Sequence, residues 1–261
     1  MDIIVCVKHV PDTTEAEVVI REDQRGIKTE DLPYVINEWD EYAIEEAILM
    51  KERLGGTVVA VTVGPEEAEA TLRRCLAKGA DWAMRIWDEG LEEADGFAIA
   101  KVLHAAIKDM KYDLILTGTQ AGDDGYAVVG VALAELLGIP HAALVKKIEL
   151  KDGSAVVHRE LEGGLEEVVE VRLPAVFTIQ TGINEPRYVS IMGIKRARKK
   201  ELRVVSLSDL GLTVDEVLQS SWLTIKRMYV PPSKKQAVII QGSPADVAAQ
   251  IVEILKSKGL M

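Results

Sequence analysis

Residues 112–130 read YDLILTGTQAGDDGYAVVG, and this stretch decides the expected fold. Residues 112–117 predict a buried strand, residues 118–125 a glycine-rich turn, and residues 126–137 a helix that ends at Gly138 and Pro140. Such a turn offers free backbone N–H groups and the positive end of a helix dipole to an anion. The spacing fits a nucleotide-binding loop and equally a tight structural turn. It matches neither GxGxxG nor a Walker A loop, because no lysine follows the last glycine.

Similar units precede this one in the chain. Strand-like apolar runs occupy residues 2–8, 57–63 and 82–87, and amphipathic helices are predicted at 40–54, 66–78 and 94–110. The alternation predicts an α/β protein, with a Rossmann-like parallel sheet and helices on both faces. Ligands of such sheets bind beyond the carboxyl ends of the strands, so the loops that follow the strands are the informative ones.

The second half of the chain changes character. Short strands at 155–161, 166–172 and 175–180 are separated by turn residues and are interpreted as antiparallel additions to the sheet. Near the end, residues 236–241 read as a strand, and Ser243-Pro244 begins a helix. We therefore expect a nucleotide-binding α/β domain over residues 1–200 and a C-terminal arm over residues 201–261 that packs on a partner subunit.

Composition narrows the function classes. The 261 residues are 48% hydrophobic and 28% charged, which excludes disorder as the dominant state. A net charge of −11 argues against a nucleic-acid-binding surface. Two cysteines and four scattered histidines predict no metal site. The N-terminus does not resemble a signal peptide, and no segment is apolar enough to span a membrane, so we expect a cytoplasmic protein.

Two further segments carry polar groups toward the same sheet edge. In Asn37-Glu-Trp-Asp40, Asn37 and Asp40 fit a helix cap, and the same groups could reach an adenine or ribose. In the loop that begins at Lys8, His9 is a possible general base, but a packing or surface role is the more ordinary one for a lone histidine. The sequence predicts no catalytic residue, and Cys6 lies in a buried strand and is expected to be unreactive.

A basic segment follows at Lys195–Arg203, with six cationic residues and one acidic residue. Just before it, Ile191 and Met192 are apolar side chains in polar surroundings. An apolar anchor ringed by cations is typical of a docking patch for an acidic partner, although a solvated helix face fits the charges as well.

These residues together resemble the beta subunit of electron transfer flavoprotein. The matching motifs run in order over nearly the whole chain: Val7-Lys8-x-Val-Pro-Asp12, Asn37-x-x-Asp-x-Tyr-Ala-x-Glu-Glu-Ala47, Val63-Gly-Pro65, Gly118-x-Gln-Ala-x-Asp-Asp124, Leu173-Pro-Ala-Val176 and Asn184-Glu-Pro-Arg-Tyr188. Each motif alone is weak, but the ordered set is specific.

The resemblance implies a heterodimer with an alpha subunit that carries an FAD on a mobile domain. It implies an AMP or an FAD in the beta subunit, an arm that clasps the partner, and docking on a dehydrogenase or quinone oxidoreductase through Ile191 and Met192. Carried over residue by residue, the cofactor contacts would be Cys6 (through its backbone), Asn37, Glu38, Trp39, Asp40, Val63, Gly118, Thr119, Gln120, Ala121, Gly122, Asp123, Asp124, Gly125, Tyr126, Ala127, Val128 and Val129.

The resemblance also bears on which cofactor is bound. Members that bind AMP typically place Asn, Gln and Thr before the last glycine of the loop, whereas this chain has Ala127, Val128 and Val129 before Gly130. We therefore expect FAD rather than AMP, and with it NADH-dependent electron bifurcation. The glutamine that the family places before the last Val-Gly is absent here.

Three alternatives stay open at this point. One is a simple AMP-binding carrier without bifurcation. Another is an ATP-using α/β hydrolase or ligase, in which Asp123 and Asp124 would bind a metal ion close to a triphosphate. The third is a regulatory module that senses nucleotides without a flavin or an obligate partner.

Overall fold

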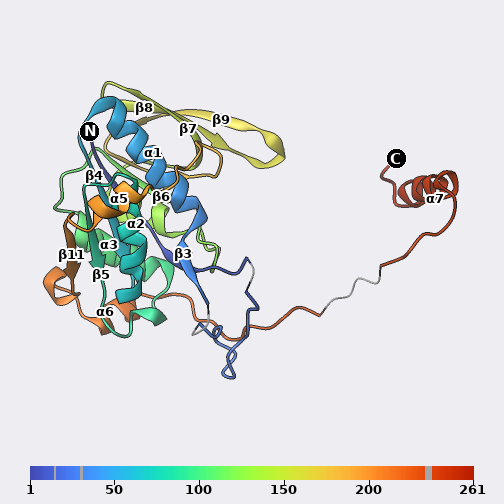
Figure 1. Cartoon of the computed structure of the whole chain (residues 1–261), viewed down its shortest axis with the longest axis horizontal. Helices are drawn as coiled ribbons and strands as arrows, with labels where there is room; N and C mark the ends of the chain where they lie inside the picture. The colour runs from blue at the N-terminus through green and yellow to red at the C-terminus, as the bar shows by residue number, and fades with distance from the viewer. Residues whose placement is uncertain (15, 30–31, 233–236) are drawn as a thin grey trace. The chain divides into compact units, whose positions relative to one another are not determined.

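A computed structural model describes residues 1–14, 16–29, 32–232 and 237–261 (Figure 1). The chain divides into two compact units, Met1–Lys226 and Arg227–Met261, and each is described by itself. Among the described residues, no helix combines the length and the apolar character needed to cross a membrane.

A nine-stranded sheet forms the centre of the first unit, in the order β11-β5-β4-β1-β6-β10-β7-β8-β9. The strands from β11 to β7 are parallel, and β8 and β9 add to that edge in antiparallel fashion. The bounds are β1 Asp2–Cys6, β4 Thr57–Val63, β5 Trp82–Ile86, β6 Leu114–Gly118, β7 His141–Lys151, β8 Ser154–Glu160, β9 Glu166–Arg172, β10 Ala175–Ile179 and β11 Leu202–Val205.

Alternate residues of a strand point to opposite faces of the sheet, and in the central strands both sets are apolar. Helices therefore cover both faces. Ile3 and Val5 face one core with α1 (Glu38–Leu54), α2 (Glu69–Lys78) and α5 (Ile191–Ala197). Ile4 and Cys6 face the other core with α3 (Gly96–Ile107), α4 (Val129–Leu137) and α6 (Val214–Gln219). Short 3-10 turns lie at Glu66–Ala68, Leu91–Glu93, Glu162–Gly164 and Ser208–Leu210. The expected α/β class with a largely parallel, Rossmann-like sheet is confirmed.

The prediction that three antiparallel strands are added to the parallel sheet was partly wrong. β8 and β9 are antiparallel as predicted, but β10, the strand expected at 175–180, is parallel and lies inside the sheet between β6 and β7. Strand β7 was not predicted at all, because its sequence AALVKKIEL lacks a clean alternation of apolar and polar residues. After β7, β8 and β9 the chain therefore returns past β7 and forms β10 beside β6. Local turn signals in the sequence do not predict this connection.

The first unit extends beyond residue 200, where the sequence placed the start of the arm. β11 pairs with β5 in the main sheet, and the carboxylate of Asp95, at the start of α3, accepts the backbone N–H groups of Trp222 and Leu223 at 2.6 and 3.0 Å. The second unit contains α7 (Pro244–Ser257), which begins at the expected Ser243-Pro244. Residue 236, the start of the expected strand, lies outside the described residues, and residues 237–241 form no strand.

Candidate functional site

The candidate site lies at the carboxyl ends of β1, β4 and β6, on the loop that joins β6 to α4. Val128 precedes α4 and makes no side-chain capping bond, so its side chain leaves the first N–H groups of this helix without a cap. Ala127 adopts a left-handed backbone with φ +53°, which is uncommon for a residue with a Cβ. The loop therefore turns sharply into a helix whose amino end offers donors to an anion.

Two glycines bring this loop close to the rest of the sheet edge. A Cβ at Gly118 would lie 2.4 Å from Asp40 Oδ1, and a Cβ at Gly130 would lie 2.5 Å from Thr117 Oγ1. Real Cβ atoms do not approach other atoms so closely. Glycine at 118 lets the end of β6 meet the start of α1, and glycine at 130 lets α4 sit directly against the strand ends.

Asn37 and Asp40 hold the loop in place from the start of α1. Asn37 Nδ2 donates to the carbonyl of Gln120 at 2.8 Å, and its Oδ1 accepts from the N–H of Gly122 at 3.0 Å. Asp40 accepts from the N–H groups of Lys8 at 2.7 Å and Gly118 at 2.8 Å. The two side chains join the exits of β1 and β6, and Asn37 makes no side-chain capping bond to its own helix.

Asp40 is buried where it makes these two hydrogen bonds, since only 5% of its surface is exposed. Burial raises the pKa of the Asp40 carboxyl to about 7, against the opposing effect of the hydrogen bonds from Lys8 and Gly118. The two hydrogen bonds from Lys8 and Gly118 show that Asp40 organises the backbone around it.

Lys8 controls the charge of the loop. Its Nζ lies 2.7 Å from Asp123 Oδ1 and 2.8 Å from Asp124 Oδ2. Burial favours a lower pKa for Lys8, but the two carboxylates outweigh it and the pKa is raised. Both aspartates are paired with this cation, which offsets one of their two negative charges and so weakens their repulsion of a bound phosphate.

Trp39 links the site to the hairpin side of the sheet. Its Nε1 donates to Gln180 Oε1 at 2.9 Å, and Gln180 Nε2 donates to Glu160 Oε2 at 3.1 Å. The indole is thereby fixed by a hydrogen bond to the end of β10 and, through it, to β8.

The structure brings most of the predicted residues to this edge. Asn37, Asp40, Gly118, Gln120, Gly122, Asp123 and Asp124 form one hydrogen-bonded set with Lys8. Thr119 binds the carbonyl of Ile179, and Cys6 and Val63 end their strands close by. Glu38 is exposed, as are Gly122 to Ala127. Gly125 and Tyr126 make hydrogen bonds within the loop, to Ala121 and Asp124.

Other candidates have separate surroundings. His9 Nδ1 lies 2.9 Å from Thr71 Oγ1, and its ring stacks on Tyr34 in a small hairpin formed by β2 (His9–Pro11) and β3 (Tyr34–Ile36). Burial lowers the pKa of His9. Ile191 and Met192 belong to α5, which packs on α2, and neither joins the set described above.

The chemistry that this edge supports is binding. Burial raises the pKa of the Cys6 thiol to about 12, so it is not a nucleophile at neutral pH. The site offers backbone donors, a pair of carboxylates that share one lysine cation, and a rigid frame. Lys8 and Gln180 were not singled out as site residues. The sequence signal for Lys8 was its position just after the buried strand β1. No local sequence pattern points to Gln180 as a site residue.

Comparison with known proteins identifies the family of the chain. The family model described as "Electron transfer flavoprotein domain" matches residues 25–210. The chain is 42% identical to the electron transfer flavoprotein subunit beta of Methylophilus methylotrophus, over 98% of each chain.

Two other relatives extend the comparison. The electron transfer flavoprotein subunit beta of Bacillus subtilis (strain 168) is also 42% identical, over 99% of this chain and 98% of the relative. The subunit CarD of the caffeyl-CoA reductase-Etf complex of Acetobacterium woodii is 37% identical over the full length of both.

Proposed function

The chain belongs to the electron transfer flavoprotein family, among its beta subunits, and from this premise we propose that it acts in a heterodimer with an alpha subunit. Its own part is to bind an adenine-containing cofactor at the loop between β6 and α4 and to dock the heterodimer on redox partners. A flavin supplies the one- and two-electron chemistry when bound, and the protein contributes its placement and surroundings.

The proposed position of the cofactor site rests on one observation. The amino end of α4 has no side-chain cap, and the loop before it is fixed by Asn37 and Asp40. Lys8 offsets one of the two negative charges of Asp123 and Asp124 and so reduces their repulsion of an anion there. This combination suits the phosphates of an adenylate, which backbone N–H groups and a helix dipole bind well.

FAD is the favoured cofactor over AMP. Ala127, Val128 and Val129 give the helix start neither amide nor hydroxyl donors, so a terminal phosphate has only the backbone to bind. A small apolar helix start leaves room for a diphosphate and an extended flavin. With a second FAD on the alpha subunit, NADH would be the reductant and the complex would divide its electrons between two acceptors.

The deciding experiment is to co-express this chain with its alpha subunit, purify the heterodimer and release the cofactors by denaturation. Chromatography then counts flavins and AMP per heterodimer. Two FAD molecules support the favoured form, and one FAD with one AMP identifies the simple carrier. A heterodimer with neither a second FAD nor AMP would overturn the assignment of the site.

Two surfaces are proposed for the partners. Ile191 and Met192 on α5 are 75% and 62% exposed and would dock the redox partner, a dehydrogenase or quinone oxidoreductase. The second unit would pack on the alpha subunit, because the apolar residues Ile251, Val252 and Ile254 of α7 are exposed within it.

The ATP-using alternative is less well supported by the geometry. It requires Asp123 and Asp124 to bind a metal ion beside a triphosphate, whereas both carboxylates are engaged by Lys8. ATP turnover by the purified heterodimer would revive that alternative.

A further inference from the structure

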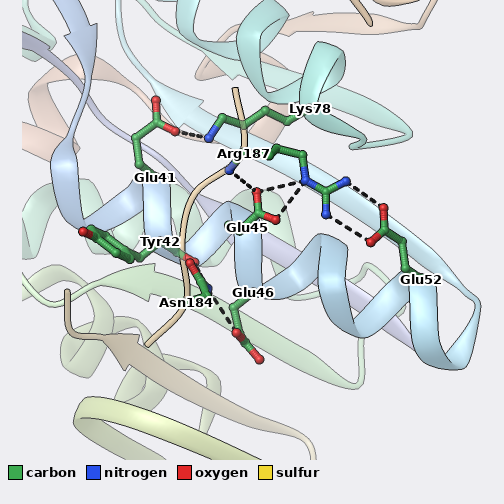
Figure 2. A network of polar contacts seen from close by, with 8 residues as sticks. All are labelled: Glu41, Tyr42, Glu45, Glu46, Glu52, Lys78, Asn184 and Arg187. Carbon is green, nitrogen blue, oxygen red and sulfur yellow. Dashed lines mark hydrogen bonds and ion pairs between the residues drawn. The ribbon is translucent and has the colours of Figure 1, made fainter. Parts of the chain in front are cut away.

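The segment 184–187 is fastened to α1 at both of its ends (Figure 2). Asn184 Nδ2 donates to the carbonyl of Tyr42 and to Glu46 Oε2, both at 3.0 Å. At the other end, Arg187 donates its backbone N–H and its Nε to Glu45. A surface loop thus carries a dense set of specific polar contacts to one helix.

Arg187 is the centre of this clamp. Its Nε lies 2.8 Å from Glu45 Oε1, and its Nη1 and Nη2 lie 2.7 and 3.0 Å from the two oxygens of Glu52 (Figure 2). Glu45 is only 2% exposed, and Arg187 is the cation paired with it. A planar guanidinium can engage two carboxylates at fixed angles, which a lysine ammonium cannot do.

The chain beyond Arg187 is fixed as well. Ser190 caps α5 by accepting from the N–H of Gly193 at 3.0 Å. Gly193 lies so close to α2 that a Cβ there would be 2.6 Å from the carbonyl oxygen of Ala77. Arg73 of α2 donates to the carbonyls of Ala197 and Lys200, both at 3.0 Å. Helix α5 is therefore held against α2 along its inner side.

Between these two attachments the chain turns its apolar side chains outward. Tyr188 is fully exposed, and Ile191 and Met192 are largely exposed. Apolar side chains gain free energy when they leave water, so holding three of them at a rigid surface is unfavourable unless a partner covers them. A fixed loop also avoids the entropy loss that a mobile one would suffer on binding.

We propose that Arg187, acting through Glu45 and Glu52, is a positioning residue that holds Tyr188, Ile191 and Met192 in the conformation that the redox partner binds. The inference rests on the proposed function and adds the contacts that hold its docking surface in one conformation. The exposed cations Lys195, Arg196, Arg198 and Lys199 follow the apolar residues in the last turns of α5 and just after it. The fitting partner is therefore a protein with an apolar pocket and an acidic rim.

The test uses the purified heterodimer with a flavin-dependent dehydrogenase that reduces it, chosen from the source organism. The main variant is Arg187→Gln combined with Glu45→Gln, so that no buried carboxylate is left without a cation. Arg159→Gln is the matched control, because Arg159 pairs with Glu167 across β8 and β9 and its hydrogen bonds go to Ala143 and Glu167 rather than to the loop. Three quantities are measured: KM and kcat for the heterodimer as the dehydrogenase's substrate, its reoxidation by the small dye dichlorophenolindophenol, and amide hydrogen exchange over residues 184–197.

We expect the double variant to raise KM about tenfold, since the binding-competent loop would be populated only about a tenth of the time. We expect kcat and the dye rate to stay constant and exchange at residues 188–197 to accelerate. Arg187→Lys should give an intermediate KM, and Arg159→Gln should match the wild type. A double variant with faster exchange but an unchanged KM would overturn the inference.

Ile191→Glu separates this inference from the proposed function. If Ile191→Glu leaves KM unchanged, the docking role of α5 itself fails. If it raises KM while the Arg187 variants do not, docking stands and the positioning role is wrong. Should the double variant fail to assemble, Glu52→Gln replaces it, because Glu52 is at the exposed end of the clamp. An unchanged KM in that variant would contradict the inference equally.

Discussion

Lys8 shows how one residue can change the charge of the proposed cofactor loop. Replacing it by methionine keeps most of the unbranched side chain but leaves Asp123 and Asp124 without their cation. Two uncompensated carboxylates near the amino end of α4 would compete with a phosphate for its donors. We expect Lys8→Met to weaken cofactor binding about tenfold, measured as the FAD or AMP retained after dialysis, and Lys8→Arg to stay near the wild type. Equal retention in Lys8→Met would show that the aspartates do not face the cofactor.

Asp40 gives a prediction about pH. Its pKa is about 7 in the folded protein against an ordinary 3.8, because burial disfavours the charge. Between these values the folded state keeps a proton that the unfolded state has lost, so stability falls as pH rises. At about 1.4 kcal/mol per pKa unit, Asp40 lowers the free energy of unfolding by about 4 kcal/mol between pH 4 and 7.

The comparison with Asp40→Asn isolates this effect, since asparagine does not titrate. The stability of the wild type relative to Asp40→Asn should fall from pH 4 to 7 and level off above pH 7. Urea unfolding at several pH values measures the difference. Parallel pH profiles for the two proteins would mean that Asp40 ionises normally in the folded state.

At the scale of elements, the position of α4 depends on Gly130. A Cβ at this position would meet Thr117 Oγ1 at 2.5 Å and Thr178 Cγ2 at 2.7 Å, so alanine must push the helix away from the sheet. Alanine is the better helix former, by about 1 kcal/mol. We nevertheless expect Gly130→Ala to lower the free energy of unfolding by about 1 to 3 kcal/mol, measured in urea, and to release cofactor. Adding Thr178→Ser should restore part of the loss, and a stabilised Gly130→Ala would contradict the close packing described.

Local sequence patterns predicted some of the strands and helices but not others. Strands β1, β4, β5 and β6 and their helices follow from apolar runs, amphipathic spacing and glycine stops, which are local signals. The loop at 118–130 was predicted from its glycines for the same reason. Strand β7 and the place of β10 were not, because they depend on pairing between distant segments. Lys8 and Asp123 are 115 residues apart, so their contact follows only from the sheet order β1-β6.

For the whole molecule, the division at Lys226 leads to the last prediction. The buried residues of both cores lie at or before Val217, and α7 buries none of its residues within the second unit. Ending the chain after Lys226 keeps β11, α6 and the contacts of Asp95 with Trp222 and Leu223. The free energy of unfolding of the first unit should therefore change by no more than about 0.5 kcal/mol, as measured by chemical unfolding.

Assembly should respond differently to the same truncation. If the second unit packs on the alpha subunit, its removal should abolish the co-purification of the two subunits, and the exposed apolar residues of α7 are the reason to expect this. The substitutions Ile251→Lys and Ile254→Lys in the full chain should weaken assembly without altering the first unit, and size-exclusion chromatography distinguishes the two effects. A truncated chain that still assembles fully would place the subunit interface on the first unit instead.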